Sequence, residues 1–417
     1  MNCYETVIHH IKTIKEKVES SLYASGKDLE NDYYMINQLT GTKNNIDQHQ
    51  NFTQIFKVHE FLISEVCKVH DKEKDSLNEE TFKKSRDIKE INTLLNDCKR
   101  ALNMYSFNNI DYDYFFIGDL HSDAISLKRI LHICDFFNSI VKNKNKRLVF
   151  LGDYVDRGGA HIKVMENILA LKFIFPNNIF LLKGNHDDGN IVENEIKLPV
   201  RKPENEEDES CFLFYLHNLL KSNGLLNMDI INMYLKFFNS LCNIAFVTNK
   251  NMTLLAVHGG IPRPRKNDPT YYNYINTLSD LTDDSILDDI NKTIINNMLW
   301  SDPCCNNEVD LRETKGRFRF TVEHFNKFQK VVNFDLLVRG HQAEKDGYKR
   351  FFDDRLITIF SSGLILENEI SINSETAYKD VTPKILYFPK CGQPSLLDLN
   401  EEFINYPKWN SDTRTII

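Results

Sequence analysis

The chain has 417 residues, of which 41% are hydrophobic and 26% charged, and its formal net charge is -8. This composition is that of a globular protein and excludes a chain that is disordered throughout. The negative net charge argues against a protein that coats nucleic acid or an anionic membrane, because both need a basic field.

The sequence gives no sign of a membrane span or of classical secretion. No stretch approaches the roughly 18 uninterrupted apolar residues that a span requires. The first residues, MNCYETVIHHIKTIKEKVESS, carry charges where a secretory signal needs an apolar core. The nine cysteines are scattered without a CxxC pair, which is typical of a reducing compartment. We therefore expect a cytoplasmic protein.

The first hundred or so residues are predicted to be helical. Segment 1–105 is rich in Lys, Glu and Asn and contains no proline. Apolar residues recur at helical spacing in three stretches, 7–22, 55–69 and 88–102. Ser76 and Glu79 have the spacing of a capping box ahead of the third stretch. We expect three helices in a hairpin-like arrangement, with a protein partner docked on them as a further hypothesis.

From about residue 112, short apolar runs typical of strands each end in a glycine beside Asp, Asn or His. The runs are 114–117, 147–151, 179–182, 252–257 and 334–338. Strands of α/β folds build sites at their C-terminal ends, so we expect the polar residues there to meet. Those residues are Asp119, His121, Asp153, Asp156, Arg157, Asn185, His186, His258 and His341.

The chemistry of this set suits divalent metal ions. Asp, His and Asn side chains without a thiolate are ligands for Mn, Fe or Zn. Six candidate ligands are too many for one open catalytic ion and suit two. Two ions about 3.5–4 Å apart can bridge a water, lower its pKa and aim it in line at phosphorus. The sequence therefore indicates a two-metal site that acts on phosphate.

The strand-end motifs, taken in order, also resemble those of a known family. They are GDLH (118–121), GDYVDRG (152–158), GNHD (184–187), HGG (258–260), LWSDP (299–303) and the segment 338–362. This order resembles the phosphoprotein phosphatase family of metallophosphatases, over about residues 112–365. The resemblance implies an α/β (α+β) metallophosphatase fold, in which helices flank a central β-sandwich, here with an added N-terminal helical region.

The resemblance divides the chain into three parts. Residues 1–105 would be the helical region and 110–370 the catalytic domain, with an insertion near 188–235 that looks longer than in the family's eukaryotic core. Residues 371–417 would form a C-terminal strand and tail. We hypothesise that the insertion and the N-terminal helices set substrate choice.

The resemblance implies a role for each strand-end residue. Asp119 and His121 would hold the first metal, Asp153 would bridge both, and Asn185, His258 and His341 would complete the second. His186 would protonate the leaving oxygen and be oriented by Asp156, while Arg157 would clamp a phosphate oxygen. A metal-bridging hydroxide would attack phosphorus directly, so no phosphoenzyme is expected.

Several positions depart from the family pattern. Ser122 stands where Gly is usual, Asp187 where Glu is usual, and 362–365 replace a loop that carries an active-site tyrosine. A second substrate-binding arginine is not obvious, so Lys315 or Arg317 is expected to take its place, with Arg319 as a further option.

The leading interpretation is a metal-dependent phosphoprotein phosphatase. Phosphoserine and phosphothreonine are the family default, and phosphotyrosine or dual specificity stays open because the pocket loop differs. The alternative is a dinucleoside polyphosphate hydrolase, favoured by Asp187 and the run HGGIP (258–262). An inactive scaffold is disfavoured because all six ligand positions and His186 are intact. The added helices are compatible with a bacterial effector that is translocated into a host cell and acts in the host cytosol.

Overall fold

The computed structural model describes most of the chain, and every structural statement below refers to the described residues. These are 3–42, 51–74, 88–94, 98–101, 104–107, 111–143, 145–193, 195–198, 210–262, 298–305, 318–367 and 370–401. Lys315 and Arg317, and the capping box at Ser76 and Glu79, lie outside them.

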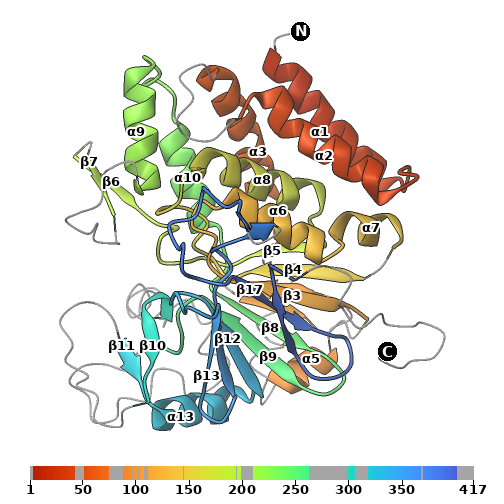
Figure 1. Ribbon diagram of the computed structural model, residues 1–417, viewed down its shortest axis with the longest axis vertical. Helices are drawn as coiled ribbons and strands as arrows, with labels where there is room; N and C mark the ends of the chain where they lie inside the picture. Colours follow the sequence, from red (N-terminus) through yellow and green to blue (C-terminus); the bar gives the residue numbers. More distant parts are fainter. Residues whose placement is uncertain are drawn as a thin grey trace.

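Two mixed β-sheets packed face to face form the centre of the fold (Figure 1). One sheet runs in the order β18 (Ser395–Asp398), β17 (Lys384–Phe388), β3 (Asp113–Ile117), β4 (Lys146–Phe150) and β5 (Ile179–Leu181). The other runs β1 (Lys99–Ala101), β2 (Met104–Phe107), β8 (Ile244–Thr248), β9 (Thr253–Val257), β12 (Leu336–Arg339), β14 (Leu356–Ile359) and β13 (Tyr348–Phe351). The expected β-sandwich is therefore confirmed.

The strand sequences explain why both sheet faces are covered. In β3, Tyr114 and Phe116 point into the core between the sheets, whereas Phe115 and Ile117 point to the helices outside. This alternation is the two-residue period of a strand, and apolar residues on both faces require a layer on each side.

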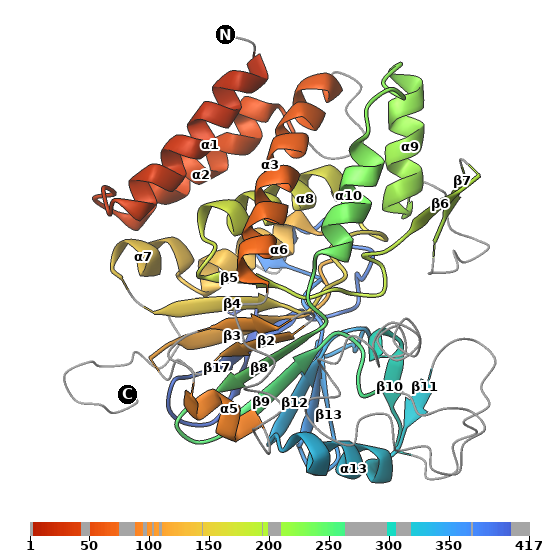
Figure 2. The same cartoon turned by 180° about the vertical axis from the view of Figure 1, so that it is seen from behind.

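Helices supply the two outer layers. Those over the five-stranded sheet are α6 (Ala124–Ile133), α7 (Phe136–Val141) and α8 (His161–Ile174). Over the seven-stranded sheet lie α5 (Ile88–Leu94) and α13 (Val322–Val332), seen at the lower edge in Figure 2. None of the described helices has an apolar stretch long enough to cross a lipid bilayer.

The N-terminal helices continue the upper helical layer (Figure 1). They are α1 (Cys3–Glu19), α2 (Gly26–Thr40) and α3 (Phe52–Glu73), and they share one hydrophobic core with α8. Polar contacts join them too, because the Tyr33 hydroxyl donates to the Asn167 carbonyl at 3.0 Å. α2 was not expected from the periodicity, although Ser25 caps its first turn.

The expected helix over 88–102 is wrong beyond its first part. α5 ends at Leu94, and residues 99–101 and 104–107 instead form β1 and β2, so the proposed helical region 1–105 runs into the large sheet. β2 pairs in parallel with β8, and this sheet contact overrides a weak helical pattern.

The later segments contain more structure than expected. The described residues of the insertion form β6 (Asn190–Val192), β7 (Glu195–Lys197), α9 (Phe212–Ser222) and the start of α10 (Ile230–Asn239). Within residues 372–401, the described part of the C-terminal segment, two strands are present, β17 and β18, where one was expected. Two small pairs complete the described elements, β10 (Ser301–Pro303) with β11 (Phe318–Phe320) and β15 (Leu366–Glu367) with β16 (Ile370–Ser371).

Candidate metal centre

The polar residues at the strand ends meet at one edge of the sandwich. β3, β4 and β5 of one sheet lead into Asp119, Asp153 and Asn185. β9 and β12 of the other sheet lead into His258 and His341. The sheets are held together there, because Asp119 forms an isolated bridge with Phe360 and Leu182 forms another with Cys242.

Several of these residues have left-handed backbone conformations, which side chains other than glycine adopt at a cost. Their φ angles are 43° for His121, 54° for Asp153, 69° for Asp156, 70° for Arg157 and 72° for His341. Such conformations cluster at functional sites because the surrounding structure must hold them in place.

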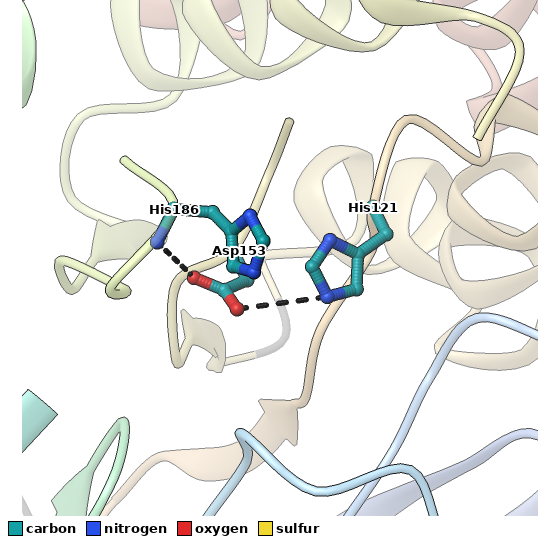
Figure 3. A group of neighbouring side chains, drawn as sticks. All are labelled: His121, Asp153 and His186. Atoms are coloured by element: carbon teal, nitrogen blue, oxygen red, sulfur yellow. Dashed lines mark hydrogen bonds and ion pairs between the residues drawn. The ribbon is translucent and has the colours of Figure 1, made fainter. Parts of the chain in front are cut away.

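A first group of possible ligands surrounds Asp153. Its Oδ2 lies 3.6 Å from His121 Nε2, and its Oδ1 accepts the backbone N–H of His186 at 2.9 Å (Figure 3). In Figure 3 the His186 ring overlaps Asp153 in the view, and the His121 ring has one nitrogen directed at the Asp153 carboxylate. One ligand atom from each of the three lies within 4.8 Å of the others, a spacing that can hold a metal ion. Asp119 Oδ2 is 3.6 Å from the same His121 nitrogen.

A second group shares Asp153 and adds His258 and His341, again within 4.8 Å of one another. His258 Nε2 lies 3.3 Å from Asp153 Oδ2 and 2.8 Å from Asn185 Oδ1. His341 Nδ1 is also 2.8 Å from Asn185 Oδ1. The arrangement thus brings all six predicted ligands together, with Asp153 common to both groups.

The electrostatics of the site call for positive charge. Burial alone would raise the pKa of Asp153, but the neighbouring imidazoles, chiefly that of His258, hold it well below its usual value. Burial opposes protonation of His258, yet the Asp153 carboxylate raises its pKa to about 9. Asp119 Oδ2 is buried and accepts no hydrogen bond among the described residues. A cation would satisfy this oxygen, so the donor set fits divalent metals.

His186, a member of the first group, also forms a hydrogen-bonded pair with Asp156. His186 Nδ1 and Asp156 Oδ2 are 2.7 Å apart, and Asp156 Oδ1 accepts the backbone N–H of Phe212 at 2.7 Å. Burial acts to raise the pKa of Asp156, but the hydrogen bond and charge of His186 outweigh it and lower that pKa. With Nδ1 held by Asp156, Nε2 is the His186 nitrogen that can exchange a proton with a ligand.

Asp187, which the sequence gives no structural role, joins the loop after β4 to the loop after β5. Its Oδ2 accepts the backbone N–H of Asp153 at 2.7 Å and of Gly184 at 2.8 Å, and its Oδ1 accepts that of Tyr154 at 3.0 Å. Burial, together with the Asp153 carboxylate, raises the pKa of Asp187 to about 7. A Cβ on Gly184 would lie 2.1 Å from an Asp153 oxygen, so no larger residue fits there.

Asp123 is a second anchor that the sequence analysis missed. It caps α6 by accepting the Ser126 N–H at 2.8 Å, and it accepts from Ser362 at 2.9 Å and Asn373 at 2.8 Å. The loop after β14 is thereby fixed to the loop that carries His121. Asp123 could have been found from the sequence as an N-cap residue, because it directly precedes the apolar helical pattern of α6.

An aromatic side chain from a distant segment also reaches the site. The Tyr378 ring lies 5.4 Å from that of His121 and 4.7 Å from that of Phe360, centroid to centroid.

Two of the arginines considered for substrate binding are among the described residues. Arg157 is half-buried, and its backbone N–H donates to the Ser210 carbonyl at 2.7 Å. Arg319 is exposed on β11.

The chain is also similar in sequence to known proteins. The model of the calcineurin-like phosphoesterase family matches residues 113–345. A serine/threonine-protein phosphatase of Caenorhabditis elegans is 25% identical over 282 residues, which cover 66% of this chain and 52% of that protein. A second C. elegans protein named as a serine/threonine-protein phosphatase is 26% identical over 253 residues, covering 59% and 57%. The chain thus spans little more than half the length of these curated relatives.

Solved structures with a similar chain path include two phosphatases. A Saccharomyces cerevisiae protein serine/threonine phosphatase aligns with a TM-score of 0.48 and 17% identity, covering 80% of this chain and 82% of that one. A cold-active protein-tyrosine phosphatase of a Shewanella species aligns with a TM-score of 0.41 and 15% identity, covering 71% and 82%.

Proposed function

Because the chain belongs to the calcineurin-like phosphoesterase family, we propose that it is a metal-dependent phosphoprotein phosphatase that hydrolyses phosphate monoesters. The observation that carries this proposal is the pair of overlapping groups that share Asp153, one of which contains His186, itself hydrogen-bonded to Asp156. Hydrolysis of a phosphate ester requires a general acid for the leaving oxygen and cations that stabilise the phosphoryl group, and this arrangement can provide both.

The six strand-end residues would hold two divalent cations, with Mn, Fe or Zn as the ions that suit them. They are Asp119, His121, Asp153, Asn185, His258 and His341. When bound, two such ions supply charge stabilisation for the phosphoryl group and a water of lowered pKa.

The remaining residues would handle the substrate and its proton. His186 would donate a proton from Nε2 to the departing oxygen, with its ring orientation fixed by the 2.7 Å contact with Asp156. The Arg157 guanidinium would bind phosphate oxygens as a planar fork. Lys315 or Arg317 would add a second cationic contact. Burial of Asp119, Asp153 and His258 keeps bulk water away from the charges.

Phosphoserine and phosphothreonine are the proposed substrates. The names of the two C. elegans relatives support this preference, although neither is more than 26% identical to the chain. Phosphotyrosine hydrolysis and cleavage of dinucleoside polyphosphates remain alternative outcomes of the experiment below.

The test is hydrolysis by the full chain, purified with Mn²⁺, of phosphoserine, phosphothreonine and phosphotyrosine peptides and of diadenosine tetraphosphate. We expect the phosphoserine and phosphothreonine peptides to be cleaved fastest. His186→Asn should lower kcat for these peptides by about 10²–10⁴-fold, the usual contribution of a general acid. Asp153→Asn should lower activity at least as much, because it removes the ligand common to both groups.

Matched controls are His9→Asn and Asp71→Asn, which change exposed residues of α1 and α3. Both should keep wild-type rates. Full activity in His186→Asn and Asp153→Asn would contradict the proposal, and a strong preference for the dinucleotide would establish the alternative.

A further inference from the structure

Helix α9 of the insertion begins directly against the His186–Asp156 pair. Phe212 is its first residue, and the Phe212 N–H donates to Asp156 Oδ1 at 2.7 Å. The N-cap residue of α9, Cys211, makes no side-chain cap bond of its own. The Asp156 carboxylate, which comes from the loop after β4, therefore takes the capping position of a helix some 56 residues further along the chain.

The start of α9 is fixed to that loop by a second backbone contact and by packing. Arg157 N–H donates to the Ser210 carbonyl at 2.7 Å. The fully buried Phe212 ring packs edge to face on Tyr234 of α10, with centroids 4.9 Å apart and planes at 88°. The Tyr234 hydroxyl is in turn hydrogen-bonded to His59 of α3. The Phe212 N–H, the donor to Asp156, is thus held in place by packing on α10, which in turn contacts α3.

Each of the two Asp156 carboxylate oxygens makes its own hydrogen bond, one to the main chain and one to the His186 ring. Oδ1 is held by the Phe212 N–H and Oδ2 by His186 Nδ1, each at 2.7 Å. With one oxygen anchored to the main chain, rotation of the carboxylate is blocked and the other oxygen stays aimed at the imidazole. Bonds from an N–H to an ionised carboxylate are among the stronger ones, and a helix N-terminus favours the negative charge.

We propose that the Phe212 N–H is a positioning group for the acid step: it fixes Asp156, and Asp156 fixes His186. This inference rests on the proposed phosphatase function and assigns the insertion a part in the chemistry, in addition to any influence on substrate choice. Residues 210–212 carry no catalytic side chain, but their main-chain groups would position Asp156 and, through it, His186.

The decisive comparison is Phe212→Pro against Phe212→Ala. Both variants lose the ring, but only proline loses the N–H. Proline is well tolerated at the first position of a helix, and Cys211 has φ -108° and ψ 115°, the extended conformation that a residue before proline prefers. The two variants therefore differ at this position of the main chain: alanine keeps the N–H, and proline replaces its hydrogen with Cδ, which faces Asp156 Oδ1.

The readout is kcat on two substrates with different leaving groups. A phosphoserine peptide releases an alkoxide that needs a proton, whereas p-nitrophenyl phosphate releases a stable phenolate that does not. Relative to Phe212→Ala, Phe212→Pro should lower kcat about 10-fold on the peptide, a fraction of the 10²–10⁴-fold total for a general acid, and about 2-fold or less on p-nitrophenyl phosphate.

A double-mutant cycle with His186→Asn shows whether the effect passes through the acid. In that background Phe212→Pro and Phe212→Ala should have equal rates on the peptide, because the group being positioned has gone. Far-UV circular dichroism and the thermal midpoint show that the variants are folded. If Phe212→Pro does not fold, replacing Phe212 by phenyllactic acid removes the N–H, keeps the ring, and should show the same leaving-group dependence relative to the wild type.

The outcomes separate the two proposals. Equal losses on both substrates, or a peptide effect that persists in the His186→Asn background, would overturn the inference while leaving the phosphatase function intact. A wild-type chain that hydrolyses neither substrate faster than Asp153→Asn would overturn the proposed function, and the inference with it.

Discussion

Ser122 occupies a backbone conformation that suits glycine, next to a predicted metal ligand. Its φ is 59°, directly after His121 at 43°, and its N–H donates to the Tyr154 carbonyl at 2.9 Å. The buried Ser122 hydroxyl lies 2.6 Å from Nδ1 of His161, the first residue of α8. This bond offsets strain of the order of 1 kcal/mol that a side chain incurs in the left-handed region.

Replacing Ser122 by alanine and by glycine separates these two effects. Ser122→Ala keeps the strain and loses the hydrogen bond, so the free energy of unfolding should fall by about 1–2 kcal/mol. Ser122→Gly loses the same bond but relieves the strain, so it should be about 1 kcal/mol more stable than Ser122→Ala. Urea unfolding followed by circular dichroism measures both. An alanine variant as stable as the glycine variant would show that the strain is absent.

The side chains that meet at the site were predictable, including Asp156 as the residue that orients His186, but the backbone groups that hold Asp156 and Asp187 in place were not. Asp153 and His258 each follow an apolar strand that ends in a recognisable motif, so the topology alone brings them together. Asp187 and Asp156 depend on backbone N–H groups from other loops, whose positions only the assembled fold defines. No spacing in the sequence carries that information.

At the scale of elements, α2 and α3 are joined to α8 by a buried polar cluster. Glu166 of α8 is fully buried, and it accepts from Asn37 Nδ2 at 2.6 Å and from Thr42 Oγ1 at 2.8 Å. Its Oε2 also lies 3.4 Å from Nε2 of His59 in α3. A carboxylate without water is tolerated there because these groups surround it.

Glu166→Ala should therefore destabilise the whole chain. It leaves the partners of the carboxylate buried without their acceptor, so the free energy of unfolding should drop by about 3–5 kcal/mol. The control is Glu65→Ala, which removes only a partly exposed contact with Lys68 and should cost about 0.5 kcal/mol or less. Chemical denaturation compares the two variants. Equal stabilities would mean that the N-terminal helices are not held through Glu166.

The elements were predicted unevenly for a physical reason. α1 and α3 have clear apolar stripes, whereas residues 99–101 and 104–107 have a weak helical pattern and form β1 and β2. β2 pairs with β8, about 140 residues later in the chain, and β1 pairs with β2. Local periodicity describes which face is buried but does not reveal a distant strand that supplies the hydrogen bonds.

At the scale of the molecule, the net charge of -8 and the proposed phosphate substrate are compatible because the affinity is local. Acidic residues such as Asp119 and Asp153 lie inside the site, where cations would neutralise them. The phosphate would meet those cations and Arg157, and the charge of the outer surface acts only at longer range.

The most direct test of this account is a titration of the metal-free chain with Mn²⁺ by isothermal calorimetry, with elemental analysis of the loaded protein. The account predicts two ions per chain, and at 100 times the dissociation constant a single site should stabilise the fold by about 2.7 kcal/mol. Asp153→Asn should lose high-affinity binding at both sites, while Asp71→Asn binds as the wild type does. Two tightly bound ions in Asp153→Asn, or none in a wild-type chain that hydrolyses phosphopeptides, would contradict the two-metal centre.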